Sequence, residues 1–469
     1  MIRVLVIRVL DTRKLATCKL NTMINIPDSD KKRVVIVGGG FAGLTLARKL
    51  ARRDFQVVLL DKNNYHQFQP LFYQVAMSGL EPSSIAFPLR KIFQRRKNVV
   101  IRVAEVERVN PKSQIVETSL GSLRYDYLVL AIGADTNFFG NENIASKVIP
   151  MKSVSEALYL RNKILDDYEK AVTTDDFEER QGLIDVVIVG GGPTGVEVAG
   201  ALAEMKTYIL PKDFREELDC DEVDIHLIQS SPMLLKGMSE QAGAAAERFL
   251  TKLGVNIRKN TRVTDFDGKY VYMNDDTKIR TNKVIWAAGI IGNTIQGLPD
   301  ELITRSRRIR VNEYCQVEGF PEIYAIGDIA FRETEAYPYG HPQVAQVAIQ
   351  QGKNVAQNLL NIQQNKALKA FTYKDKGSMA TIGRHRAVVD LPSLRFQGAF
   401  AWFVWLLIHL FAILGVKNKL FVFINWVWNY FTYDQSLRLI IKPRIPKEEG
   451  EIALMILFAL VSVTIFLHL

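Results

Sequence analysis

Short apolar runs rich in β-branched residues alternate along the chain with Gly-rich turns and helix-forming segments. The first run, Val34–Val37, has the composition of a strand buried on both faces of a parallel sheet. A Gly-rich turn, the helix-forming segment Leu44–Leu50, a second apolar run at Val57–Leu60 and then Asp61 follow it. The pattern predicts a strand–turn–helix–strand unit.

The same unit returns about 150 residues later, which indicates a duplicated domain and not a solenoid. Val186–Val189 is its first apolar run, Gly190–Gly195 its turn, Val196–Met205 its helix and Ile225–Ile228 its second run. Strands that alternate with helices in this order favour a parallel sheet covered by helices.

Three further apolar runs read as buried strands: Tyr127–Ile132, Val284–Ala288 and Ile323–Ile326. We therefore expect an α/β fold with two Rossmann-like dinucleotide-binding domains, the second inserted in the first, and C-terminal amphipathic membrane-associating helices. The expected boundaries are an N-terminal extension (1–30), the first domain (31–150 and 301–370), the second domain (155–300), a C-terminal membrane-associating region (371–447) and a hydrophobic tail (448–469).

The composition is that of an ordinary globular protein, with 48% hydrophobic and 23% charged residues among 469. Collagen-like and low-complexity classes are excluded. The three cysteines, Cys18, Cys220 and Cys315, lie far apart, which argues against a disulfide framework, a CxxC zinc site and a redox-active pair. The histidines show no metal-binding spacing, and we expect no metal.

The net charge of +10 is compatible with simple solubility or with an anionic partner. An apolar, Trp-rich segment near the C-terminus favours an anionic membrane surface over nucleic acid, so no nucleic-acid partner is expected. Residues 1–22 have neither a clean apolar core nor a cleavage site, and we expect an extension without function ahead of an ordinary start at Met23.

The first turn, Gly38-x-Gly40-x-x-Gly43, has the spacing that lets a backbone approach a pyrophosphate. The N-terminus of the following helix supplies free N–H groups and a positive dipole for phosphate. Asp61 ends the second strand, where a carboxylate holds ribose hydroxyls. Together these features predict a dinucleotide site.

The second turn, Gly190-x-Gly192-x-x-Gly195, meets the same conditions except that Gln229 stands where an acid is expected. A Gln side chain can bond a ribose hydroxyl but lacks the negative charge that repels a 2′-phosphate. The sequence therefore leaves undecided whether the substrate is NADH or NADPH. Two nucleotide folds need two nucleotides. The simplest arrangement is FAD in the first and NAD(P)H in the second, with hydride transfer from nicotinamide to flavin.

Four ordered motifs resemble type II NADH dehydrogenases, which are single-subunit, non-pumping NADH:quinone oxidoreductases. The motifs are NYHQFQPLFYQVA (64–76), GGGPTGVEVAG (190–200), PQVAQVAIQQG (342–352) and YKDKGSMATIGRHRAV (373–388). The resemblance covers about residues 32–446. It implies non-covalent FAD, oxidation of NADH, two-electron reduction of a quinone and a place in a respiratory chain.

The resemblance also assigns site residues. It places FAD on Gly38, Gly40, Gly43, Asp61, Gly133 and Asp328, and NAD(P)H on Gly190, Gly192, Gly195, Gln229 and Gly289. The motif AQxAxQ makes Gln346 and Gln350 quinone-site residues, and their spacing of four puts them on one helix face. Glu197 is expected to assist proton transfer to the quinone, and Lys376 to line the quinone cavity.

Residues 398–416 form a 19-residue stretch with His409 as its one strongly polar side chain. As one helix it would be about 28 Å long, near the thickness of a bilayer core. Hydropathy allows a transmembrane hairpin, whereas the resemblance favours helices lying in the plane of one leaflet. The resemblance also implies a homodimer at the cytoplasmic face of a bacterial inner membrane. The almost wholly apolar stretch 452–469, which the resemblance does not cover, predicts an additional single-pass anchor.

Three alternatives remain from the sequence. A sulfide:quinone oxidoreductase shares the fold but depends on active-site cysteines. An NADPH-using reductase fits Gln229. A membrane-attached redox sensor that binds the nucleotides without catalysis would carry the same motifs.

Overall fold

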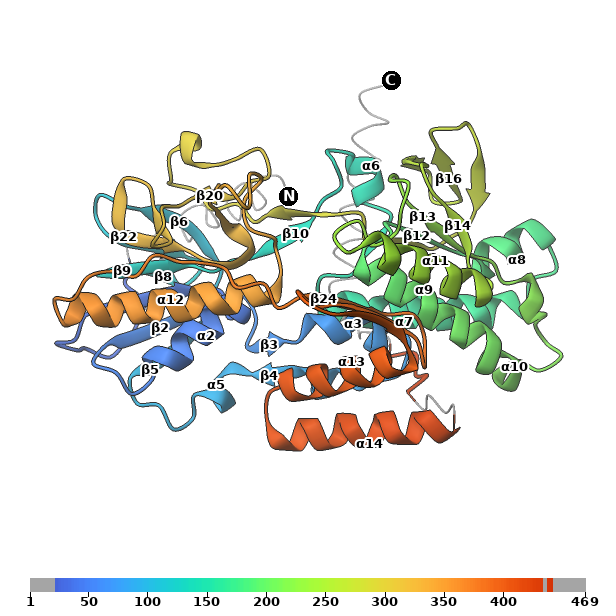
Figure 1. Cartoon of the computed structure of the whole chain (residues 1–469), viewed down its shortest axis with the longest axis horizontal. Helices are drawn as coiled ribbons and strands as arrows, with labels where there is room; N and C mark the ends of the chain where they lie inside the picture. Colours follow the sequence, from blue (N-terminus) through green and yellow to red (C-terminus); the bar gives the residue numbers. More distant parts are fainter. Residues whose placement is uncertain (1–21, 433–436, 442–469) are drawn as a thin grey trace, which may run out of the picture.

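The computed structural model describes residues 22–432 and 437–441. Two sheets built mainly of parallel strands stand side by side, and the C-terminal helices lie below the junction between them (Figure 1). Residues 1–21 of the expected N-terminal extension (1–30) and the whole expected anchor at 452–469 lie outside the described residues. The α/β fold class predicted from the alternating pattern is confirmed.

The first sheet has six strands in the order β21-β22-β9-β1-β2-β5. Its centre is β1 (Arg33–Val37), flanked in parallel by β2 (Gln56–Asp61) and β9 (Tyr127–Leu130). The outer strands are β5 (Val99–Val103), β22 (Phe320–Ala325) and β21 (Gln316–Val317). The strand from residues 320–325 therefore returns to the sheet begun by residues 33–37.

Alternate residues of β1 enter two different cores, as the two-residue period of a strand requires. Val34 and Ile36 pack under α2 (Phe41–Leu50) and α12 (Ala345–Gln363). Val35 and Val37 face the other side, which a smaller sheet covers. That sheet comprises β6 (Val106–Asn110), β7 (Ile115–Thr118) and β8 (Gly121–Arg124).

The second sheet repeats this architecture with five strands in the order β11-β18-β12-β13-β14. Val186 and Ile188 of β12 (Val186–Val189) pack in the core that includes residues of α9 (Pro193–Tyr208) and α11 (Glu240–Lys252). Val187 and Val189 face a core shared with a small antiparallel sheet. The remaining strands are β11 (Ile149–Pro150), β13 (Ile225–Ile228), β14 (Asn256–Arg258), β18 (Val284–Trp286) and, in the small sheet, β15 (Val263–Phe266), β16 (Tyr270–Met273) and β17 (Lys278–Arg280).

Backbone pairing ties the two halves together. β10 (Ala134–Thr136) pairs antiparallel with β19 (Ile290–Gly292), and both follow strands that end in the expected glycines. The connection passes through α7 (Val154–Ala171) and α8 (Phe177–Ile184) before β12. β11 at residues 149–150 pairs with β18 of the second sheet, although the sequence-based boundary put it in the first domain.

The C-terminal region builds a three-stranded antiparallel sheet against the second domain. Its strands are β24 (Ser378–Thr381), β25 (Ala387–Asp390) and β26 (Arg395–Gly398). β24 contacts α9, β25 contacts α11, and α13 (Ala399–Ala412) covers the sheet. Figure 1 shows α13 and α14 (Val416–Thr432) stacked at the lower edge of the molecule.

The 19-residue helix considered for 398–416 is not formed. α13 ends at Ala412, Ile413 is extended, and Gly415 has a φ of +77°, a conformation that favours glycine. α13 has 14 residues, so at 1.5 Å per residue it is about 21 Å long. Among the described residues, the structure contains no helix with the length and hydropathy needed to cross a bilayer.

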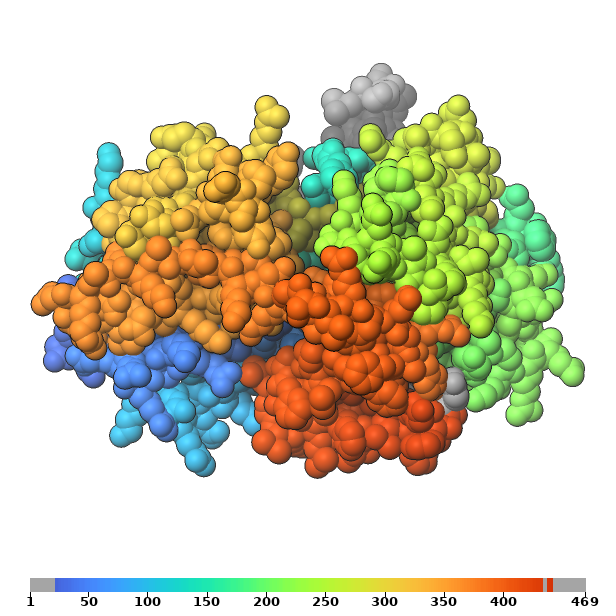
Figure 2. All heavy atoms as spheres, viewed as in Figure 1, coloured from blue at the N-terminus to red at the C-terminus, as the bar shows by residue number. Residues whose placement is uncertain are grey.

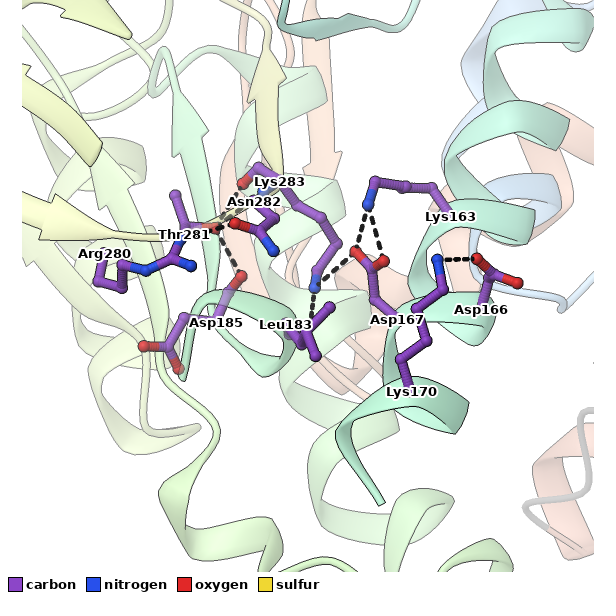
Figure 3. Close-up of polar contacts among 10 residues, drawn as sticks. All are labelled: Lys163, Asp166, Asp167, Lys170, Leu183, Asp185, Arg280, Thr281, Asn282 and Lys283. Carbon is purple, nitrogen blue, oxygen red and sulfur yellow. Dashed lines mark hydrogen bonds and ion pairs between the residues drawn. The ribbon is translucent and has the colours of Figure 1, made fainter. Parts of the chain in front are cut away.

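A buried ion pair joins α7 to the start of β18 (Figure 3). Lys283 and Asp167 are both fully buried, and their side chains meet at 3.2 Å. The Lys283 ammonium also donates to the Leu183 carbonyl, and Lys163 donates to the outer side of Asp167 at 2.7 Å. Burial lowers the pKa of Lys283 to about 8, against the opposing effect of Asp167.

We expect Asp167→Asn to lower the free energy of unfolding by about 3–5 kcal/mol, because it leaves the buried Lys283 ammonium without its counter-charge. Urea unfolding followed by fluorescence measures this loss. Lys170→Met, which breaks the exposed i,i+4 pair with Asp166, is the matched control and should cost less than about 1 kcal/mol. An equal loss of unfolding free energy in the two variants would contradict a stabilising role for the buried Asp167–Lys283 pair.

Candidate functional site

The first Gly-rich turn is shaped by contacts that exclude a side chain. Gly38 has a φ of +102°, and a Cβ on it would lie 2.3 Å from the Ala131 carbonyl oxygen. A Cβ on Gly43 would lie 1.9 Å from the Gly38 oxygen, so helix α2 reaches the strand only with glycine there. Gly40 differs, because no atom lies within 4 Å of the Cβ position. That open side leaves room for a phosphate to approach the backbone.

Asp61 closes the same turn from the end of β2. Its two carboxylate oxygens accept hydrogen bonds from the backbone N–H groups of Gly39 and Asn63, each at 2.6 Å. Burial nevertheless raises the pKa of Asp61, and the two hydrogen bonds oppose that rise. The carboxylate is thus fixed beside the turn, where a ribose would lie.

A cavity of about 650 Å³ opens at this turn, within the range of small-molecule and cofactor sites. Its lining includes Gly38, Gly40, Asp61, Gly133 and Asp328, five of the residues expected from the sequence. Burial raises the pKa of Asp328. Gly43 does not line the cavity, and its role is to let helix α2 pack against the strand.

Several lining residues were missed by the sequence analysis. Lys152 brings a cation into the cavity, and Asn293 donates to the Ile132 carbonyl at 2.7 Å. Gln343 donates to the Asp328 carbonyl at 3.0 Å, so it fixes the loop that carries this acid. Lys62 and Asn63 were detectable because they follow Asp61 directly, whereas the others come from remote segments.

The second turn reproduces the geometry of the first. A Cβ on Gly190 would lie 2.4 Å from the Ala287 carbonyl oxygen, and one on Gly195 would lie 1.9 Å from the Gly190 oxygen. Gly192, like Gly40, has no atom within 4 Å of its Cβ position. Gly289, at the end of the neighbouring strand, has a φ of +147° and lies near the Phe139 ring.

Gln229 takes the place that Asp61 holds in the first turn. Its Oε1 accepts from the Gly191 N–H at 2.9 Å, and its Nε2 donates to the Ser231 hydroxyl at 2.6 Å. The neutral amide therefore preserves the structural bond to the turn while removing the negative charge. Among residues 22–432 and 437–441, no acid bonds the second turn as Asp61 bonds the first.

Glu197 lies on α9, two residues after Gly195, and only 9% of it is exposed. One carboxylate oxygen accepts the Thr381 N–H at 3.4 Å. Burial raises the pKa of Glu197 to about 8, so the group carries a proton at neutral pH. A protonated buried acid of this kind is suited to proton transfer.

The two glutamines of α12 have different surroundings. The carboxamide of Gln350 donates to the Lys374 carbonyl at 2.9 Å and accepts the Lys374 N–H at 3.0 Å. Both ends of the Gln350 carboxamide therefore bond the segment that leads to Lys376. The Lys376 side chain is exposed. Gln346 is partly buried, and the adjacent Ala345 and Ala348 line the 650 Å³ cavity.

Comparison with known proteins identifies this arrangement. Residues 32–352 match the pyridine nucleotide-disulphide oxidoreductase family, and residues 376–433 match the NDH2 C-terminal domain. The type II NADH:quinone oxidoreductase NdhA of Mycobacterium tuberculosis is 36% identical over 413 residues, covering 84% of this chain and 86% of the relative. The chain belongs to the type II NADH:quinone oxidoreductase family.

A second relative agrees with this family, and two solved structures share the fold. The type II NADH:quinone oxidoreductase Ndh of M. tuberculosis is 34% identical over 86% of this chain and 89% of its own length. NDH2 of Plasmodium falciparum, solved in complex with NADH, superposes with a TM-score of 0.81 over 88% of this chain and 100% of that chain, at 23% identity. The sulfide:quinone oxidoreductase of Aquifex aeolicus shares the fold with a TM-score of 0.67, covering 88% and 96% at 19% identity.

Proposed function

We propose that this protein is a membrane-attached NADH:quinone oxidoreductase that binds FAD without a covalent bond. The observation that carries the proposal is the 650 Å³ cavity at the first turn, which joins a backbone suited to phosphate with two partly buried acids, Asp61 and Asp328. Its relatives named type II NADH:quinone oxidoreductases match more than four-fifths of the chain, and the family match over residues 32–352 includes both turns.

The residues around the cavity fit FAD. The open side of Gly40 and the N-terminus of α2 suit the pyrophosphate, and Asp61 suits the adenosine ribose. We place Asp328 and Gly133 at the ribityl end. Bound FAD would accept a hydride from NADH and pass two electrons to a quinone.

NADH would bind at the second turn, with its pyrophosphate at Gly192. Gln229 and Gly289 complete this half of the proposal. Because Gln229 is neutral and already bonded to Gly191 and Ser231, it cannot repel a 2′-phosphate by charge. NADPH therefore remains a second substrate of this site.

We place the quinone beside α12 and Glu197. Gln346 and Lys376 are its proposed polar contacts. Gln350 would act by holding the Lys374 backbone, and with it the loop of Lys376, because both ends of its carboxamide bond Lys374. No nucleophile is required, since the reaction consists of hydride, electron and proton transfer.

The sulfide:quinone alternative is weakened by the surroundings of the two described cysteines. Cys315 is buried in the core of the first domain, where burial raises the pKa of its thiol to about 12. Cys220 lies in the second domain, and burial raises its pKa too. Neither lines the 650 Å³ cavity. A thiol kept protonated is a poor nucleophile.

Anaerobic stopped-flow spectroscopy tests both half-reactions. NADH should bleach the flavin absorbance of the purified protein, and a quinone should then restore it. A colourless protein that takes up no flavin would overturn the proposal. Bleaching without reoxidation would instead favour a redox sensor.

Two matched variants separate the two nucleotide sites. Gly40→Ala and Gly192→Ala should both fold, because each Cβ enters open space at an ordinary φ of −68° or −76°. Gly40→Ala should lose bound flavin, whereas Gly192→Ala should keep it and show a KM for NADH raised by about tenfold or more. Flavin absorbance per protein and steady-state kinetics measure the difference. Flavin retained in Gly40→Ala would refute the assignment.

Gln229→Glu should raise the ratio of kcat/KM for NADH to that for NADPH by at least about tenfold, since the added carboxylate would repel a 2′-phosphate. Steady-state kinetics with each nucleotide measures the ratio. Gln229→Asn, which keeps the site neutral, is the control. A ratio that does not respond to the added charge would show that Gln229 is not at the ribose.

The membrane face proposed for this protein is an exposed apolar surface on α13 and α14. Figure 2 shows these orange-red helices forming the lower surface of the molecule. Large apolar side chains are more than half exposed there: Phe400, Phe403, Leu407, Phe411, Val416, Leu420, Phe421, Ile424, Trp428 and Phe431. Apolar patches of this kind mark protein or membrane contacts. Helices lying in the plane of one leaflet fit them best.

Basic residues border the same face. Lys417 and Lys419 lie at the start of α14, whose Asn418 donates to the Ser83 carbonyl at 2.8 Å. α5 (Leu89–Ile92) follows shortly after Ser83 and begins a segment with five basic residues: Arg90, Lys91, Arg95, Arg96 and Lys97. We propose that this border binds anionic headgroups on the cytoplasmic side.

The expected homodimer stays a prediction.

Phe421→Glu combined with Trp428→Glu should weaken binding to vesicles by at least about tenfold, because each lost aromatic contact is worth roughly 1.5–3 kcal/mol. Co-sedimentation with vesicles of a zwitterionic lipid and an anionic lipid measures binding. Tyr339→Glu, at an 89% exposed aromatic outside this face, is the control and should bind normally. Binding that is unchanged in the double variant would place the membrane face elsewhere.

A further inference from the structure

A second, smaller cavity lies between the second domain and the C-terminal helices. Its volume is about 90 Å³, larger than the roughly 30 Å³ that one water molecule takes in the liquid. Tyr73 and Gln74 of α3 (Phe72–Ala76), Glu204 of α9 and Arg384 line it. Aromatic residues of α13 and α14 complete the wall: Trp402, Trp426 and Tyr430.

The Tyr73 hydroxyl has a defined hydrogen-bond direction. The indole N–H of Trp426 donates to Gln74 Oε1 at 2.8 Å, and an indole N–H is only a donor. This fixes the Gln74 carboxamide so that its Nε2 donates to the Tyr73 oxygen at 2.9 Å. The Tyr73 hydrogen is then left for the Thr381 hydroxyl, 3.1 Å away.

Thr381 connects the cavity wall to Glu197. Its hydroxyl meets Tyr73, and its own backbone N–H donates to Glu197 Oε1 at 3.4 Å. Thr381 is 2% exposed, and it contacts Glu197 through its backbone N–H and not through its hydroxyl. One buried residue therefore contacts both the Tyr73 hydroxyl and the acid.

Glu204 lies two turns after Glu197 on α9, on the same side of the helix. Its carboxylate accepts the Arg384 N–H, and the Arg384 guanidinium donates to the Asn429 carbonyl of α14. Burial raises the pKa of Glu204 to about 7, against the nearby charges of Arg384 and Arg386. Such a group both gains and loses a proton near neutral pH.

The reaction requires a proton from water. Reduction of a quinone by NADH follows NADH + Q + H⁺ → NAD⁺ + QH₂, so two electrons and one hydrogen come from NADH and the second hydrogen comes from solution. A protein that encloses the quinone must supply that proton through its own groups.

We propose that this proton enters through the 90 Å³ cavity at Glu204 and passes by the hydroxyls of Tyr73 and Thr381 to Glu197. In this path, water in the cavity bridges Glu204 and Tyr73, and rotation of the Glu197 carboxyl brings one of its oxygens to the Thr381 hydroxyl. The proposal rests on the function proposed above, in which Glu197 serves the quinone. No bond other than O–H is made or broken along the path, and each group returns to its starting state once a new proton arrives. The other ionisable groups around the cavity are Arg384, Arg386, His385 and Tyr430.

Stopped-flow reoxidation by a water-soluble quinone, with a pH-indicator dye to follow proton uptake, tests the path. Glu204→Gln and Tyr73→Phe should reduce the flavin with NADH at the wild-type rate. Their reoxidation and proton uptake should slow together by at least about tenfold at pH values above 7. Because the groups act in series, the double variant should be no slower than the slower single variant.

Controls keep the outcome interpretable. Glu169→Gln, at an exposed position on α7, should match the wild type. The wild type should also lose stability relative to Glu204→Gln as pH rises from about 4.5 to 7, because a carboxyl whose pKa is raised in the folded state favours folding only while protonated. Thermal unfolding at several pH values, at equal flavin content, measures this difference.

Three results would overturn the proposal. The first is that both single variants reoxidise and take up protons at the wild-type rate. The second is that the double variant is slowed by the product of the two single effects. The third is that Glu204→Gln leaves the pH dependence of Tm unchanged. A wild-type protein that NADH cannot reduce, or that quinone cannot reoxidise, would instead refute the proposed function itself.

Discussion

Close contact between backbone atoms at the two Gly-rich turns controls the rest of the structure. At Gly38 and Gly190 the chain passes so near the carbonyl of a neighbouring strand that a Cβ would overlap it. Gly43 and Gly195 then let the next helix approach the turn itself. These contacts bring helix N-termini and strand ends to one edge of each sheet, and this is the edge at which a nucleotide phosphate is stabilised.

The two turns are equal in geometry but not in charge. Asp61 and Gln229 make the same bond to the turn, yet only Asp61 brings a carboxylate. The first turn thus has a negative group beside it, whereas Gln229 is neutral. In the function proposed above, the same backbone design admits different nucleotides, because selectivity depends on the side chain at the end of the second strand.

The C-terminal sheet links this nucleotide-binding framework to the proposed membrane face. Its strand β24 packs on α9 and places Thr381 against Glu197, while the turn after it places Arg384 between Glu204 and α14. Two carboxyls on one helix are thereby held by backbone N–H groups of a remote segment. Their pKa values rise because burial penalises the charged form more than one hydrogen bond favours it.

The sequence by itself determined the duplicated strand–turn–helix–strand units, the glycines of both turns, and Asp61 and Gln229 at matching places. These features are local, and a period of two or a glycine spacing records them directly. The tertiary structure decided what distant segments share: Lys152 and Asn293 at the cavity, Gln350 engaged by Lys374, and Tyr73 joined to Thr381. It also decided that residues 398–416 form no single helix, since Gly415 turns the chain so that α14 can pack beside α13. Such contacts depend on how separate elements are packed, and no local pattern encodes the distance between them.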